Sequence, residues 1–326
     1  MKEKKRLKYN FLNRILHKLF LGNKTLKKTL FDIECNLVNN KNFINNRKHI
    51  FISSLPRSGT TLMLNFIYSF NFYASLTYRD MPFIMAPNLF SFITNKNKII
   101  KRERYHADGI FFDLDSPESF DEVFFKTFDK KKNNSLENYD KFINNILNKY
   151  NKELYLSKNN LNYKRIDSIL KLFPNSIFFI TFRDPLDQTE SLIFQHNNFL
   201  KLQENNFILE YMNLIGHNEF GRGHLAWNKP VYFKNLSDKN YWLEQWYLFY
   251  KSVLSLINYE NVYFISYEKL CYDKLLRNKI LDILNIKDEN KFEFKYSGSK
   301  AKDKNYNLNL LDKSKELYGL LLSKSL

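Results

Sequence analysis

One stretch near the start of the chain, residues 49–70, constrains the fold most strongly. It reads HIFISSLPRSGTTLMLNFIYSF and begins with a short apolar run, Ile50 to Ile52, that predicts a buried strand. A turn of small residues follows, and apolar residues then recur at helical spacing from Leu62 to Phe70. A strand, a turn and a helix in this order predict an anion-binding site. The free N–H groups of the first helical turn and the helix dipole favour negative charge there.

The residues of the turn suit the same anion. Gly59 lets the backbone approach an anion closely. Ser58, Thr60 and Thr61 carry hydroxyl donors, and Arg57 carries a planar cation that can hold a phosphate through two hydrogen bonds. A nucleoside-triphosphatase loop would read GxxxxGK[ST], but Thr60 stands here where that loop has lysine. The turn therefore suits an anionic group that needs less charge neutralisation.

This PRSGTT motif after a strand resembles the phosphosulfate-binding loop of sulfotransferases that use 3′-phosphoadenosine 5′-phosphosulfate (PAPS). A second stretch, residues 176–198, strengthens the resemblance. Its apolar run, residues 177–182, predicts a strand buried on both faces. Arg183 ends that run, and Ser191 lies about two turns into the helix that follows. An arginine and a serine at this spacing can converge on one phosphate, and the pattern resembles the family's 3′-phosphate site.

A lysine lies between these two motifs. The apolar residues 154–156 predict another strand, with Lys158 at its carboxyl end. Ligands of open parallel sheets lie beyond that end of the strands. A helix expected over residues 163–173 and then Pro174-Asn175 follow in the family's order, although the family's proline after the lysine is missing. The resemblance implies that Lys158 neutralises charge on the leaving phosphate.

Two residues are candidates for the general base that takes the acceptor's proton. His106 stands beside Asp108 before a glycine turn, a pairing that suits proton abstraction from a hydroxyl. Asp80 lies in a segment that borders the acceptor pocket in the family. Each also has a structural alternative, since a lone histidine is more often structural and Asp80 could form a surface ion pair. Ser116-Pro117-Glu118 reads as the start of a helix, so capping explains the acidic residues there.

The succession of strand–helix units predicts an α/β fold with a parallel sheet flanked by helices, because right-handed crossovers join such units. The resemblance implies the P-loop, nucleotide-kinase-like arrangement of the sulfotransferases. We expect residues 1–48 to form a basic N-terminal helical extension and residues 49–326 a single sulfotransferase-like domain. We expect residues 201–238 to be irregular, as a lid or acceptor loop. Residues 128–152 read as an exposed insertion that contains one helix.

Charge and cysteine usage limit the partners and the compartment. The net charge of +17 attracts anions such as nucleotides, acidic glycans or a membrane surface, and we expect no nucleic-acid partner. The two cysteines, Cys35 and Cys271, form neither a metal spacing nor a disulfide framework, which indicates a reducing cytoplasm. No apolar run approaches the roughly 20 residues that span a bilayer. The basic, amphipathic N-terminus either lies on the inner face of an anionic membrane or packs on the domain.

The resemblance implies in-line transfer of a sulfuryl group from PAPS to an acceptor hydroxyl. A cell-envelope glycan, a lipid-linked sugar and a small alcohol or phenol all fit as the acceptor, and we prefer a carbohydrate. Because the metal apparatus of a Walker-type site is not evident, we expect no obligatory metal. Two other functions stay open. A phosphotransferase or nucleoside triphosphatase with a degenerate loop would bind a nucleoside triphosphate more tightly than 3′-phosphoadenosine 5′-phosphate. A non-catalytic glycan-binding relative would bind the acceptor without transfer. The sequence leaves the oligomeric state open.

Overall fold

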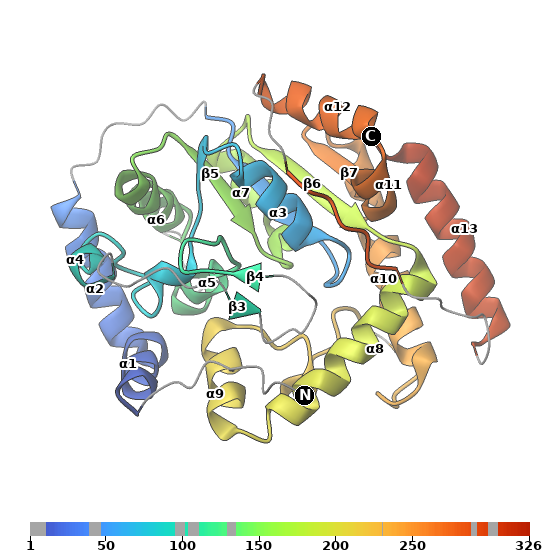
Figure 1. Cartoon of the computed structure of the whole chain (residues 1–326), viewed down its shortest axis with the longest axis horizontal. Helices are drawn as coiled ribbons and strands as arrows, with labels where there is room; N and C mark the ends of the chain where they lie inside the picture. Colours follow the sequence, from blue (N-terminus) through green and yellow to red (C-terminus); the bar gives the residue numbers. More distant parts are fainter. Residues whose placement is uncertain are drawn as a thin grey trace.

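A five-stranded parallel sheet forms the centre of the molecule (Figure 1). The computed structural model describes residues 11–38, 47–94, 102–103, 111–128, 135–229, 231–287, 292–298 and 306–326. The strands lie in the order β2 (Tyr73–Ala74), β5 (Leu154–Lys158), β1 (Ile50–Ser53), β6 (Ile177–Phe182) and β7 (Val262–Ser266). Every neighbouring pair runs parallel. A separate antiparallel pair joins β3 (Arg102–Glu103) to β4 (Phe111–Phe112). The predicted α/β class, a parallel sheet flanked by helices, is confirmed.

The helices connect and cover these strands. In chain order the α-helices are α1 (Phe11–Gly22), α2 (Lys24–Leu37), α3 (Thr60–Tyr68), α4 (Ser91–Thr94), α5 (Glu122–Thr127), α6 (Ser135–Tyr150), α7 (Ile166–Leu172), α8 (Pro185–Leu202), α9 (Asn206–Ile215), α10 (Lys239–Val253), α11 (Tyr267–Tyr272), α12 (Lys274–Leu284) and α13 (Leu308–Lys324). Short 3₁₀ turns are η1 (Tyr78–Asp80), η2 (Asn162–Arg165), η3 (Gly221–Gly223) and η4 (Leu254–Asn258). Within the described ranges, no helix combines the length and apolar character needed to cross a bilayer.

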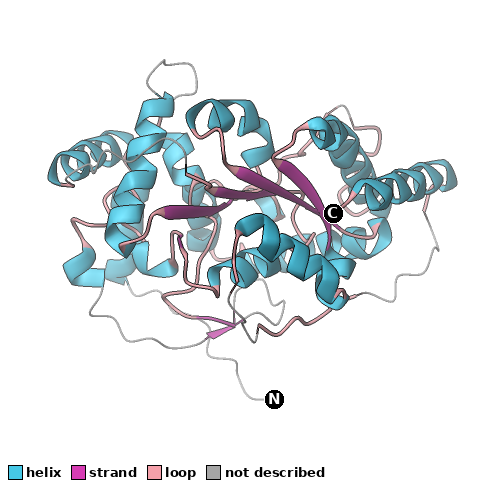
Figure 2. Cartoon of the chain, turned by 90° about the horizontal axis from the view of Figure 1, so that it is seen from above, coloured by secondary structure: helices cyan, strands magenta, loops and turns pink. Residues whose placement is uncertain are grey.

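Both faces of the sheet are buried, because side chains alternate between them along each strand. In β1, Ile50 and Ile52 join a cluster that includes Met63 of α3 and Ile280 of α12. Phe51 points to the other face and stacks on Phe178 of β6 at 5.2 Å, within a larger cluster that contains residues of α6, α7, α8 and α10. Figure 2 shows the strands running between these two layers of helices. The apolar strands read from the sequence therefore form a core buried on both sides.

Three local predictions are wrong, and tertiary packing explains each. The irregular stretch expected over residues 201–238 contains helix α9. The segment expected to be an exposed insertion contains α6, which buries Tyr139, Phe142 and Ile143 in the core. The helix expected to begin at Ser116 begins instead at Glu122, because Pro117 forms a bridge with Thr77.

The two N-terminal helices pack on the rest of the molecule. Phe31 of α2 is buried in the larger cluster, where its ring contacts those of Phe124 and Phe128. Glu34 of α2 is fully buried, and its carboxylate accepts hydrogen bonds from the backbone N–H groups of Asn88 (2.7 Å) and Leu89 (2.9 Å). Part of the segment before residue 48 thus contributes to the core. The domain boundary expected after residue 48 stays a prediction.

Asp80, one of the two candidate bases, is fully buried at the end of η1. It closes a capping box with Thr77, whose backbone N–H donates to the Asp80 carboxylate at 2.7 Å. The Lys149 ammonium pairs with the same carboxylate at 2.6 Å, and the Tyr150 hydroxyl donates to it at 2.8 Å. These contacts tie η1 to α6, so the structure gives Asp80 a role in stability.

We predict that Asp80→Ala lowers the free energy of unfolding by about 3–5 kcal/mol, because it leaves the Lys149 ammonium buried without its partner carboxylate. Urea unfolding followed by circular dichroism measures the change. Asp312→Ala, which removes an exposed carboxylate of α13, is the matched control and should shift stability by less than about 0.5 kcal/mol. Equal effects of the two substitutions would contradict the structural role of Asp80.

Candidate active site

The residues predicted to bind the sulfuryl donor follow three neighbouring strands and lie at one edge of the sheet. β1 lies between β5 and β6, and all three run parallel, so their carboxyl ends meet at the same edge. β5 ends at Lys158, β1 leads into the loop that carries Arg57, and β6 leads into Arg183. The order of strands thus brings Arg57 next to two residues that lie more than 100 positions later in the chain.

Buried hydroxyl and amide groups hold the loop after β1 in place. The Ser58 hydroxyl donates to the carbonyl of Leu55 (2.8 Å) and lies 2.8 Å from the hydroxyl of Thr181 in β6. The Gln188 side chain of α8 donates to the carbonyl of Pro56 (2.9 Å). The Ser58 hydroxyl therefore points into the protein, which differs from the prediction that it faces the anion. Its side chain supports the loop from behind.

The loop turns through two left-handed backbone conformations before α3 begins. Gly59 has φ +95°, and a Cβ atom there would lie 2.6 Å from a ring carbon of Tyr267. Arg57 also has a positive φ, +69°, a conformation that disfavours side chains and that folded proteins keep mainly at functional sites. Gly59 is the N-cap of α3 and offers no side-chain cap. The first N–H groups of the helix, from Thr60 onward, are thereby left to another acceptor.

Arg57, Arg183 and Ser191 converge beside this loop. The Arg57 Nε–H donates to the Ser191 hydroxyl at 3.0 Å, and an Nη of Arg183 reaches the carbonyl of Arg57 at 3.5 Å. The Arg183 guanidinium lies 4.8 Å from the ring centre of Tyr267. Burial raises the pKa of Tyr267 to about 12, so its ring stays a neutral partner for the cation. Two arginines therefore lie beside the same loop.

Arg183 is buried yet incompletely hydrogen bonded. Its side chain is 6% exposed, and the nearest carboxylate oxygen, on Asp187, lies 3.7 Å away. Among the described residues, its Nε–H has no hydrogen-bond partner. A buried guanidinium donor without an acceptor is unfavourable by about 1–3 kcal/mol, and an oxyanion at this position would satisfy it.

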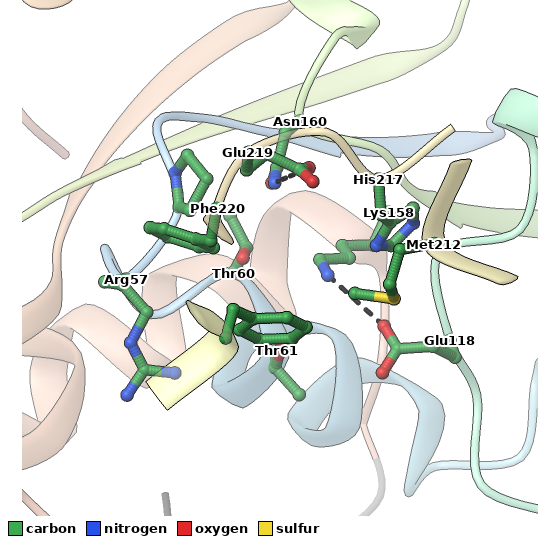
Figure 3. Close-up of a pocket in the computed structure, with 12 residues that line it drawn as sticks. Arg57, Thr60, Thr61, Glu118, Lys158, Asn160, Met212, His217, Glu219 and Phe220 are labelled. Carbon is green, nitrogen blue, oxygen red and sulfur yellow. Dashed lines mark hydrogen bonds and ion pairs between the residues drawn. The ribbon is translucent and has the colours of Figure 1, made fainter. Parts of the chain in front are cut away.

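Lys158 lies on the other side of β1 and forms a buried ion pair with Glu118. Their Nζ and Oε1 atoms are 3.2 Å apart, and the two side chains are 9% and 7% exposed. The Tyr78 hydroxyl donates to the second carboxylate oxygen of Glu118 at 2.8 Å. Figure 3 shows the two charged groups pointing toward each other in a pocket that Arg57, Thr60 and Thr61 also line.

The end of α9 and the segment after it form another wall of this pocket. Met212, His217, Glu219 and Phe220 line it. The Nε2 atom of His217 lies 2.8 Å from the carbonyl oxygen of Ser119. Because a carbonyl only accepts, Nε2 is the protonated nitrogen, and the Nδ1 of a neutral His217 ring is an acceptor. Glu219 accepts a hydrogen bond from the Asn160 amide (3.1 Å). This wall combines an apolar surface with several hydrogen-bonding groups.

Some of the predicted site residues lie together in the structure, and others do not. Arg57, Thr60, Thr61 and Lys158 line one pocket, and Arg183 and Ser191 lie against the same loop. Gly59 shapes the loop, and Ser58 supports it. The structure does not bring Asp80 into the pocket lining, and His106 lies outside the described residues. Within those residues, no cluster of three or more histidine, cysteine or acidic side chains could hold a metal ion.

The partner of Lys158 could not be predicted from the sequence. Glu118 follows Ser116-Pro117, a pattern typical of a helix N-terminus, and capping was a sufficient explanation for an acidic residue there. In the structure this segment is extended beside Thr77, and Glu118 lies across from Lys158, 40 positions later in the chain. No local signal distinguishes a capping glutamate from one that pairs across a pocket.

Comparisons with known proteins show the family. Two solved structures share 12% sequence identity with the chain. Sulfotransferase STF1 from Mycobacterium tuberculosis H37Rv has a TM-score of 0.45, with 95% of this chain and 87% of that chain covered. Sulfotransferase STF9 from Mycobacterium avium has a TM-score of 0.47, with 97% and 79% covered. A search of curated proteins finds no match. The family model described as "Sulfotransferase family" matches residues 49–287, most of the sequence, and this chain therefore belongs to the sulfotransferase family.

Proposed function

We propose that this sulfotransferase takes its sulfuryl group from PAPS and transfers it to a hydroxyl of a carbohydrate. One observation carries the proposal: two arginines and a buried lysine lie beyond the ends of three adjacent parallel strands. A donor with phosphate at the 3′ position and phosphosulfate at the 5′ position needs two anion sites that a single nucleotide can reach. The cluster of Arg57, Arg183 and Ser191 and the start of α3 supply two such sites side by side.

The residues present fit such a donor. The buried Nε–H of Arg183 lacks an acceptor within the described part of the chain, and a phosphate oxygen is a suitable one. Gly59 as N-cap leaves the N–H groups of Thr60 and Thr61 to an anion. We assign the 3′-phosphate to Arg183 and Ser191, and the phosphosulfate to Arg57 and the first turn of α3.

The transfer itself would use the Lys158–Glu118 pair. When bound, PAPS supplies a sulfuryl group whose bond to the leaving phosphate breaks as the acceptor oxygen bonds to sulfur. Lys158 stabilises the negative charge that develops on the leaving phosphate. Glu118 accepts the proton of the acceptor hydroxyl as general base. We prefer Glu118 to Asp80, whose carboxylate is bound to Lys149 and Tyr150 away from the pocket. His106 stays a prediction, and no metal has a part in this mechanism.

The pocket lining favours a neutral acceptor rich in hydroxyl groups. Glu118 and Glu219 both line it, and two carboxylates disfavour an anionic acceptor. Asn160 and His217 add hydrogen-bonding groups, and Phe220 adds an apolar part to the lining. These groups support a carbohydrate hydroxyl, such as one of a cell-envelope glycan. We propose that the transfer takes place in the cytoplasm, with PAPS as a soluble donor.

The alternative of a phosphotransferase with a degenerate loop has less support. Metal-assisted phosphoryl transfer depends on a loop lysine beside the phosphates, and Thr60 holds that position here. Lys158 approaches from the neighbouring strand instead, and it is paired with Glu118. A non-catalytic glycan-binding relative is the second alternative, and transfer of label from the donor separates it from an enzyme.

We predict that Lys158→Ala lowers turnover about 10²–10³-fold, because removing one group that stabilises transition-state charge has effects of that size. Transfer of ³⁵S from labelled PAPS to a glycan extract of the source cells measures turnover. Isothermal titration with 3′-phosphoadenosine 5′-phosphate should show a change of only a few-fold in Kd. Lys171→Ala, at an exposed position of α7, is the control. A loss of donor binding as large as the loss of turnover would refute the assignment of Lys158.

We predict that Glu118→Gln, which keeps the shape of the side chain, lowers kcat about 10²–10⁴-fold, the range typical of a lost general base. Donor binding should stay within a few-fold of the unchanged enzyme. The pH profile of kcat distinguishes a base from a packing residue, since the rise of activity with pH should disappear. Asp80→Asn is the comparison, and a larger loss of kcat there, with the fold intact, would restore Asp80 as the base.

We predict that Ser191→Ala weakens binding of 3′-phosphoadenosine 5′-phosphate about tenfold, as expected for a lost hydrogen bond to a charged group. Binding of adenosine 5′-phosphate, which lacks the 3′-phosphate, should not change. Ser323→Ala, in the exposed last turn of α13, is the control. ATP serves as the third ligand: tighter binding of ATP than of 3′-phosphoadenosine 5′-phosphate by the unchanged protein would favour the phosphotransferase alternative.

A further inference from the structure

Helix α1 is packed on one side and exposes apolar side chains on the other. His17 and Leu21 are buried, and the His17 ring contacts Phe207 and Tyr211 of α9. The opposite face carries Phe11 (80% exposed), Leu12 (62%), Ile15 (45%) and Leu19 (45%). These four positions fall within about 100° of the helix circumference, at 100° per residue. The helix therefore has a second apolar stripe, which the fold does not cover.

Further exposed apolar side chains lie in the elements next to α1. Phe20 of α1 contacts the ring of Phe90 at 5.4 Å, and α4, which follows Phe90, exposes Phe92 (64%) and Ile93 (45%). Helix α2 adds Ile33 and Leu37. Of the nineteen large apolar side chains exposed in the described part of the chain, eight belong to α1, α2 and α4. Such a concentration on a folded protein marks an interaction surface.

Basic residues border this surface. Arg14 and Lys18 lie along one side of the apolar stripe on α1. The Arg14 guanidinium lies over the Phe207 ring, and Lys18 pairs with Glu210 of α9 while 73% exposed. Lys24 and Lys28 follow on α2. In the sequence, residues 1–10 before α1 include five basic residues and one acidic residue. Basic residues of α1 and α2 therefore form a border beside the apolar stripe.

The basic residues beside the stripe indicate which kind of partner this surface binds, a second copy of the chain or a membrane. In a symmetric dimer the same face of both copies would meet, and the basic border of each copy would lie against that of the other. An anionic bilayer instead attracts the basic border and takes the apolar stripe into its interface. We propose that the exposed face of α1, with Phe11, Leu12, Ile15 and Leu19 as anchors, docks this protein on the surface of an anionic membrane.

Flotation with vesicles tests the docking without any need for enzymatic activity, so its outcome is independent of the proposed reaction. The full chain is mixed with vesicles of phosphatidylcholine alone or with about one third phosphatidylglycerol. We expect binding to the anionic vesicles, and weaker binding at high salt because salt screens the basic border. Leu12→Glu/Ile15→Glu should reduce the partition coefficient at least about tenfold, since two apolar anchors lose their transfer energy.

The matched control is Leu275→Glu/Leu308→Glu, which changes net charge equally at two leucines that are 71% and 72% exposed on α12 and α13. This control should bind like the unchanged protein. The proposal is wrong if the unchanged protein does not float with anionic vesicles, or if both double variants lose binding equally. It is also wrong if the protein binds vesicles of phosphatidylcholine alone as tightly as it binds the anionic vesicles. A dimer in sedimentation velocity that Leu12→Glu/Ile15→Glu dissociates would assign the surface to a second copy instead.

Discussion

The pairing of β1 between β5 and β6 is the constraint on which the site depends. Parallel strands end at the same edge of a sheet, so the three segments that follow these strands must meet there. The backbone hydrogen bonds of the sheet therefore bring together Lys158, the loop with Arg57, and Arg183. Gln188 and Thr181 then fix the loop from behind. The framework is rigid because both of its faces are buried.

This framework concentrates positive charge where little water reaches it. Arg183 and Lys158 are nearly buried, and the carboxylates that face them are Asp187 at 3.7 Å and Glu118 at 3.2 Å. Breaking a buried ion pair is costly, but desolvation of the two ions offsets most of what the intact pair adds to stability. For the Lys158–Glu118 pair we propose a chemical role, because a lysine and a carboxylate in contact can serve the two ends of a group transfer.

Helix α9 links the pocket to the outer surface. Met212 of α9 lines the pocket, and Tyr211 and Phe207 of the same helix pack on His17 of α1. The exposed stripe of α1 and the acceptor wall are thus separated by a single helix. If α1 holds the protein at a membrane, the pocket wall that contains Met212 lies close to that surface. We propose that this position suits a glycan acceptor carried on a membrane-bound lipid.

The strand–loop–helix at residues 49–70, the buried strand before Arg183 and the position of Lys158 at a strand end could all be read from the sequence. They depend on local periodicity and on residue types within one turn. Four features came only from the tertiary structure. Glu118 contacts Lys158 across 40 positions, and Ser58 turns toward Thr181 of another strand. Asp80 forms an ion pair with Lys149 of α6 outside the pocket lining, and the segment after α9 lines the same pocket as the loop with Arg57. Each is a contact between segments distant in the chain, and a local pattern does not specify which distant partner a polar side chain will meet.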